Sequence, residues 1–153
     1  MVPLSDALAH ALVGGCPDAV LLVTATGTIR YANPSATSLL GYDPEDLLGQ
    51  NVEVLLPEGA RGVHPGQMAG YAKEPTARAM DRRRELHARH KDGSLIDVDI
   101  MLSPLSFEEP MVGVYIRDIT ALRRAEAQVA RTIDKLNEAH ERLAELVPEL
   151  ESV

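Results

Sequence analysis

The sequence predicts an α+β domain in which helices cover one face of an antiparallel sheet. Two β-type segments near the N-terminus and three in the second half are separated by a series of short helical segments. The chain has 153 residues, 45% apolar and 25% charged, which is typical of about one globular domain. Apolar residues recur at every seventh position of the C-terminal segment, and this spacing predicts one long helix there.

Residues 4–13 are predicted to form a short amphipathic helix. Ser5 or Asp6 can cap its N-terminus, and Gly14-Gly15 ends it. So short a helix needs something to pack on, either its own domain or the same helix of a second chain. The apolar face that makes this contact contains Leu4, Leu8 and Leu12.

A β-hairpin is predicted next. Residues 19–23 form a continuous apolar run that predicts a buried strand, residues 25–27 have turn chemistry, and residues 28–31 form the returning strand.

Three short helices are predicted to follow the hairpin. Asn33-Pro34 and Asp43-Pro44 each place a capping side chain before a proline at the first helical position. These two helices end at Gly41 and Gly49, and a third brief turn over residues 52–56 precedes Pro57. Further along, His64-Pro65 is a candidate start for a fourth helix that continues through Tyr71.

The second half is predicted to contain three strands. The first, Met80 to Lys91, is strongly basic, and Asp92-Gly93 is a hairpin signal. Residues 94–103 alternate between apolar and polar side chains, with Asp97 and Asp99 on the polar face. After a loop over residues 104–110, a strand over 112–116 leads into the long helix.

The long helix is predicted to form a coiled coil over residues 119–147, with Pro148 ending it. If Leu122 is a d position, the d row is apolar throughout, whereas the a row includes Glu126 and His140. The flanking e and g positions are mostly small, so the seam suits close packing in a dimer or in a bundle of more chains. The parallel and antiparallel arrangements both remain open.

Six motifs in this order resemble a PAS domain over about residues 18–120. They are Pro17-Asp18-Ala19-Val20, Asn33-Pro34-Ser35-Ala36, Leu40-Gly41-Tyr42, Glu45-Asp46-Leu47-Leu48-Gly49-Gln50, His90-Lys91-Asp92-Gly93-Ser94 and Arg117-Asp118-Ile119-Thr120. The resemblance implies a five-stranded antiparallel sheet in the order 2-1-5-4-3 with short helices on one face. We therefore divide the chain into an N-terminal helix (1–16), a PAS domain (17–119), a coiled-coil helix (120–147) and a tail (148–153).

The resemblance also implies a function. PAS domains usually sit at the input end of histidine kinases, cyclic-dinucleotide enzymes, phosphatases or transcription regulators, and their termini commonly mediate dimerisation. We expect a signal-sensing module of a two-component system that forms a homodimer, or a higher helical bundle, through residues 4–13 and 119–147. Its output is a kinase or regulator, reached either within a longer protein or as a separate partner of a stand-alone adaptor.

Two cofactors of the family can be compared with this sequence. Flavin-photoadduct relatives need a cysteine where this chain has Val52, so a flavin photoadduct is excluded. The segment from Gly49 to Tyr71 resembles haem-binding oxygen-sensor PAS domains, in which a histidine is the proximal iron ligand. His64 takes that place as the candidate ligand of haem b, and Arg84 takes the place of an arginine that contacts bound oxygen or a propionate. Against haem stand the following Pro65, which disfavours a helical conformation at His64, and glycine-rich surroundings, so His64 is also interpreted as a surface or capping residue.

Charge and cysteine content bound the remaining classes. The net charge of −8 and the lack of interleaved aromatic residues in the basic strand disfavour nucleic-acid binding. The sequence has no transmembrane run and no signal peptide, and its single cysteine, Cys16, excludes an internal disulfide. We therefore expect a cytoplasmic protein with no membrane partner and with Cys16 as a small apolar filler.

Enzymatic activity is not expected, because the sequence has no nucleophile–base pair, metal cluster or phosphate loop at diagnostic spacing. His140-Glu141 weakly resembles the start of the phosphoacceptor box of histidine kinases. A phosphotransfer protein is therefore kept as an alternative class. A haem-based gas sensor that uses His64 is the other alternative.

Overall fold

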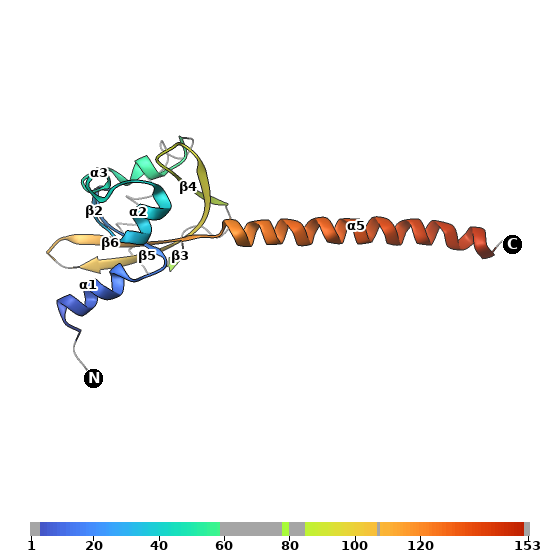
Figure 1. Ribbon diagram of the computed structural model, residues 1–153, viewed down its shortest axis with the longest axis horizontal. Helices are drawn as coiled ribbons and strands as arrows, with labels where there is room; N and C mark the ends of the chain where they lie inside the picture. Colours follow the sequence, from blue (N-terminus) through green and yellow to red (C-terminus); the bar gives the residue numbers. More distant parts are fainter. Residues whose placement is uncertain (1–3, 59–77, 80–84, 107, 152–153) are drawn as a thin grey trace. The chain divides into compact units, whose positions relative to one another are not determined.

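The computed structural model describes residues 4–58, 78–79, 85–106 and 108–151, and it divides the chain into two compact units. The first unit ends at Ile119, and the second begins at Thr120. The first unit contains one antiparallel sheet with α2 (Pro34–Leu40) and α3 (Pro44–Leu47) over one of its faces (Figure 1). The second unit is one helix, α5 (Thr120–Glu151).

The sheet has the strand order that the family resemblance implied. Its path is β2-β1-β6-β5-β3, with β4 also pairing to β5. β3 and β4 pair with different parts of the same β5 strand, so together they fill the third position of the five-position order 2-1-5-4-3. The strands are β1 (Ala19–Thr24), β2 (Ile29–Ala32), β3 (Arg78–Ala79), β4 (Leu86–Arg89), β5 (Leu95–Ser106) and β6 (Pro110–Asp118).

One face of the sheet packs against the helices to form the core. Because side chains alternate between the faces of a strand, residues on matching positions of neighbouring strands share a face. Ala19 of β1 pairs with Ile116 of β6, which in turn pairs with Ile100 of β5, and all three lie on the core side. The largest fully buried side chains are Leu21, Ile29, Leu40, Leu47, Val98 and Asn33.

The N-terminal helix α1 (Asp6–Gly14) begins two residues after its predicted start at residue 4. The predicted cap at Ser5 is confirmed, because its hydroxyl accepts a hydrogen bond from the Leu8 N–H. It contacts the sheet through His10, whose ring makes an edge contact with Tyr31. Tyr31 pairs with Leu22, so it lies on the face opposite the core. None of the residues of α1 is buried, and its leucines, Leu8 and Leu12, are 47% and 59% exposed.

The capping prediction is right for one of the two Asx-Pro pairs. The Asn33 carboxamide caps α2, and Gly41 ends that helix with a φ of 77°. Asp43 occupies the N-cap position of α3, but its side chain makes no capping hydrogen bond. Its backbone carbonyl accepts hydrogen bonds from the N–H groups of Asp46 and Leu47. These two N–H groups therefore have a partner without the Asp43 side chain. The third turn is the 3₁₀-helix η1 (Val52–Leu55).

Several strand boundaries differ from the prediction. The strand predicted over residues 112–116 runs over Pro110–Asp118 as β6. The strand predicted over residues 94–103 runs on to Ser106, because β5 and β6 stay paired as far as Ser106 opposite Pro110. Pro104 is tolerated there because proline fits strand positions that do not need an N–H donor. In the predicted strand over residues 80–91, β4 covers only Leu86–Arg89, and residues 80–84 lie outside the described residues. The predicted helix from His64 to Tyr71 also lies outside them.

The long helix extends past its predicted end. Pro148 lies inside α5, which continues to Glu151, so the boundary between helix and tail at residue 147 is wrong. Proline removes one N–H donor. The bond lost is the one to the carbonyl of Ala144, so the effect is confined to the last turns of α5.

The turn between β4 and β5 gives the first testable prediction. The Ser94 hydroxyl and N–H both donate to the Asp92 carboxylate, and they lower the pKa of Asp92. The turn is therefore stabilised at neutral pH, and this contribution is lost as the pH falls through the lowered pKa. Ser94→Ala removes the hydroxyl, which has the largest effect on this carboxylate, so an NMR titration should find a higher Asp92 pKa. An unchanged pKa would contradict this account.

Candidate functional site

The candidate site is a set of polar contacts around Asn33, whose side chain is completely buried. Its Oδ1 accepts hydrogen bonds from the N–H of Val20 (2.8 Å) and of Ala36 (2.9 Å). Its Nδ2 donates to the carbonyls of Val13 and Asp18, both at 3.0 Å. One carboxamide therefore joins the end of α1, the entry to β1 and the start of α2, with every hydrogen-bonding position filled.

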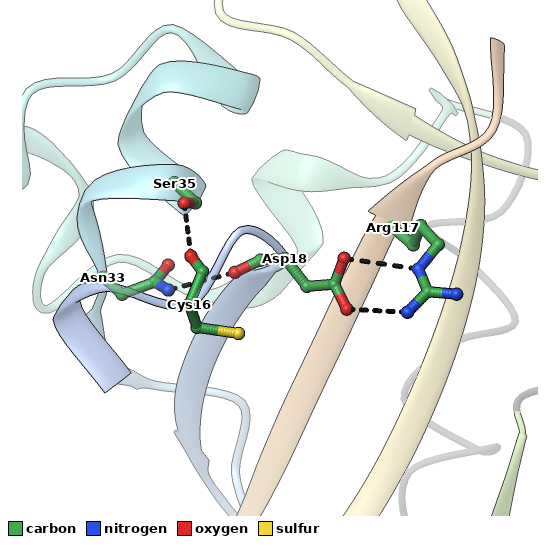
Figure 2. Close-up of polar contacts among 5 residues, drawn as sticks. All are labelled: Cys16, Asp18, Asn33, Ser35 and Arg117. Carbon is green, nitrogen blue, oxygen red and sulfur yellow. Dashed lines mark hydrogen bonds and ion pairs between the residues drawn. The ribbon is translucent and has the colours of Figure 1, made fainter. Parts of the chain in front are cut away.

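A second contact holds the connector between α1 and β1 in place. The Ser35 hydroxyl of α2 donates to the carbonyl of Cys16 at 2.6 Å. Cys16 is half-buried, and its thiol is free. Figure 2 shows that the contacts of Asn33 and Ser35 converge on this connector. The end of α1 is therefore fixed to the helical layer of the sheet unit.

The third contact joins this connector to the last strand. Arg117 of β6 donates to both oxygens of Asp18, from Nε at 3.3 Å and from Nη2 at 3.1 Å (Figure 2). These bonds raise the pKa of Arg117, and the charge of Asp99, its neighbour across the sheet, adds to the effect. The Arg117 side chain is largely exposed, so water screens the pair, and its main contribution is the two-point geometry.

The strand continues into the start of α5 through one buried residue. Ile119 is only 6% exposed, and its N–H donates to the carbonyl of Asp97 at 2.9 Å. The Asp97 carboxylate in turn pairs with His87 of β4, with 2.9 Å between Nε2 and Oδ1. This contact joins the basic strand β4 to the acidic face of β5.

These contacts make one junction between the two ends of the sheet unit. The connector that follows α1 and the strand that precedes α5 are held together by Asp18 and Arg117. Chemically, the junction has no nucleophile paired with a base. Its arrangement is suited to transmitting a displacement, because a shift of β6 acts on the Asp18 connector and on Ile119 together.

The sequence suggested three residues for cofactor binding or phosphotransfer. His64 and Arg84 are outside the described residues, so their predicted roles stay predictions. Within the ranges that the structure describes, no group of three or more His, Cys, Asp or Glu residues could hold a metal ion. His140, the candidate phosphoacceptor, is an exposed residue of α5.

Sequence reasoning found parts of this junction but not its connections. Asn33 was identified only as a helix cap, although the same side chain also bonds Val13, Asp18 and Val20. The motifs containing Asp18 and Arg117 were both noted, but 99 residues separate them. The available signal was a pair of opposite charges at the two ends of the predicted domain.

Breaking the Asp18–Arg117 pair gives the second prediction. In Arg117→Ala, the amides of residues 15–19 and 116–119 should exchange with deuterated water faster than in the wild type, because both segments lose their shared contact. Global stability should change little, since the pair is exposed. Arg30→Ala is the matched control, because it removes an exposed ion pair with Glu109 elsewhere in the sheet unit. Equal exchange rates in both variants would show that the Asp18–Arg117 pair does not hold these two segments together.

No helix within the described part of the chain is long and apolar enough to cross a membrane.

The family model for the PAS domain matches residues 17–121, which is most of the chain. The PAS domain of an HTR-like protein from Haloarcula marismortui superposes with a TM-score of 0.64 at 25% identity, covering 74% of this chain and 90% of that one.

Two curated relatives are sensor proteins. The oxygen sensor protein DosP of Escherichia coli (strain K12) is 33% identical over 88 residues, 58% of this chain. The sensor protein FixL of Bradyrhizobium diazoefficiens is 25% identical over 114 residues, 74% of this chain. The matched regions span only 11% of DosP and 23% of FixL, so the similarity concerns one module of each protein.

Proposed function

The chain belongs to the PAS domain family, and we propose that it is a signal-sensing and dimerisation module that passes a conformational change through α5 to an output domain or partner such as a histidine kinase. PAS domains are sensory modules, and two relatives of this chain are named as sensor proteins. In this proposal the chain is not an enzyme, works in the cytoplasm and binds neither nucleic acid nor membrane.

The path from β6 into α5 carries the proposal. β6 passes through the buried Ile119 directly into a helix of 32 residues. The d-row residues of this helix are 53–63% exposed in the single chain. An apolar row of this length on an exposed helix is stabilised when another helix covers it, as in a coiled coil. The d-row residues are Leu122, Val129, Leu136 and Leu143.

The proposed contacts are those that the sequence indicated. A homodimer or a higher helical bundle forms through residues 119–147 and through residues 4–13, where the leucines of α1 are exposed. The coiled coil itself is part of this proposal. The output is a kinase or regulator, as the PAS resemblance implies.

The proposal requires that the sheet unit influence the association of α5. We expect the dissociation constant of the dimer, measured by sedimentation equilibrium, to change at least about fivefold in Arg117→Ala, which is near the lower end of coupling between sites. Arg30→Ala serves as the control and should leave the dissociation constant unchanged. If Arg117→Ala also leaves the dissociation constant unchanged, the junction does not transmit a conformational change to α5.

A haem-based gas sensor is the second candidate, favoured by the similarity to a protein named as an oxygen sensor. His64 would be the axial ligand of haem b, and Arg84 would contact bound oxygen or a propionate. The haem would supply the site that binds the gas, and the remaining roles of the chain would be unchanged. This candidate requires neither enzymatic activity nor a different partner.

An absorption spectrum after addition of haemin, and then of dithionite, tests this candidate. Haem binding predicts a Soret band that shifts on reduction and is lost in His64→Ala but kept in His140→Ala, which alters a histidine outside the sheet unit. A spectrum that equals that of free haemin would reject haem and leave a sensor module with another stimulus.

A further inference from the structure

The two polar residues in the a row of α5 distinguish between the possible directions of a partner helix. Glu126 contacts Arg123 of its own helix, with 3.3 Å between Oε2 and Nη1, and His140 lies two heptads further along. In a parallel pair in register, each a residue faces its own copy. Glu126 would then lie opposite a second Glu126 in the seam, where like charges disfavour each other.

An antiparallel pair removes this conflict. In antiparallel coiled coils each a residue faces a d residue of the other helix. With Leu122 opposite Val147, Glu126 faces Leu143 and His140 faces Val129 of the second helix. Glu126 of one helix then lies one layer from His140 of the other, so unlike side chains become neighbours. This alignment covers the heptad row from residue 122 to 147 without a gap.

The charges along α5 favour the same direction. Residues 123–131 contain three arginines and one glutamate, a net charge of +2. Residues 134–145 contain two basic and four acidic residues, a net charge of −2 with histidine neutral. A parallel pair places like halves side by side, whereas an antiparallel pair places each basic half beside an acidic one. Antiparallel helix dipoles also attract.

The flanking e and g positions form no charge pairs in either direction, so they are compatible with the antiparallel alignment. In a parallel pair the facing e and g residues of the middle heptads are alanine, threonine and asparagine, so no charge pairs select that direction. In the antiparallel alignment the exposed Leu146, at a g position, lies beside Ala125 of the other helix. The alanines at both edges let the two backbones approach closely.

We propose that α5 pairs with the α5 of a second copy in antiparallel orientation, with Leu122 opposite Val147. This rests on the proposed function, because it requires α5 to be an association surface. The homodimer then covers the apolar row that an output partner would otherwise contact. The leucine face of α1 stays available for a separate contact, which allows an assembly of more than two chains.

Disulfide trapping tests the direction. Cys16→Ser removes the only cysteine, and Leu122→Cys and Val147→Cys are then introduced into separate chains. The two positions lie about 38 Å apart along one helix, so each direction predicts a different product. The antiparallel pair predicts that a mixture of the two variants forms a mixed disulfide under mild oxidation, while neither variant links to itself. Arg131→Cys, on the outer face, is the control and should form a disulfide with neither Leu122→Cys nor Val147→Cys.

The outcomes separate this proposal from the proposed function. Efficient self-linking of Leu122→Cys and of Val147→Cys would overturn the antiparallel direction and leave a parallel homodimer. A dimer in sedimentation that forms none of these disulfides would also overturn it and would leave α1 as the contact. A monomer in sedimentation at all concentrations would overturn both the direction and the homodimer.

Discussion

Replacing Asn33 by alanine is expected to lower the free energy of unfolding of the sheet unit by about 3 kcal/mol. The substitution removes four hydrogen bonds, and the N–H of Val20 and the carbonyls of Val13 and Asp18 each lose one of them. The carbonyl of Val13 keeps the N–H of Cys16 as a donor. The side chain is completely buried, so water does not replace the lost bonds without opening the structure. Urea unfolding followed by circular dichroism measures the difference.

Two matched variants identify the origin of this loss. Ser35→Ala removes one hydrogen bond from the same region and should lower the free energy of unfolding by about 1 kcal/mol. Asn33→Asp keeps both acceptor functions but loses the donor to Val13 and Asp18, and its carboxylate lies beside two carbonyl oxygens. It should therefore also be strongly destabilising. If Asn33→Ala is no more destabilised than Ser35→Ala, Asn33 does not hold the junction together.

Replacing Leu136 by aspartate is expected to weaken dimerisation by about 100-fold or more. Leu136 is in the middle of the apolar d row and is 63% exposed in the single chain. It lies in the seam in either direction of pairing, so a carboxylate there would have to be buried against apolar side chains. Because the sheet unit is a separate compact unit, it should remain folded. Sedimentation equilibrium measures the association.

The control for this prediction lies five residues away on the same helix. Arg131→Asp introduces the same residue on the outer face of α5, where its side chain stays in water, and should weaken the dimer by less than about fivefold. An equal effect of the two variants would mean that general charge repulsion, rather than burial in the seam, controls association. A dimer that survives Leu136→Asp would place the contact outside α5.

Local chemistry made much of the fold predictable from the sequence. The Asn33-Pro34 pair predicts the start of α2 correctly because both its cap and its first residue are set by neighbouring atoms. The alternation along β5 predicts correctly which of its residues face the core, such as Val98. The strand order 2-1-5-4-3 came from the resemblance to PAS domains, not from these local patterns.

Features that depend on distant partners were not predictable in this way. The end of β5 depends on β6, which stays paired beyond Pro104, and the sequence of either strand alone contains no such information. The two contacts that close the junction join Asp18 to Arg117 and Asn33 to Val13. Asp43 has the same sequence signal as Asn33 but makes no side-chain cap, so the signal does not decide the geometry.

Hydrogen exchange in Val98→Ala tests most directly whether a change in the sheet reaches α5. Val98 is buried in the core and pairs with Asp118, beside the junction and outside the helix. The account predicts faster exchange in the first turns of α5, over residues 120–128, as well as in β5 and β6, because a loosened sheet disturbs the helix start. Faster exchange that stops at residue 119 would contradict transmission and make the helix independent of the domain that precedes it.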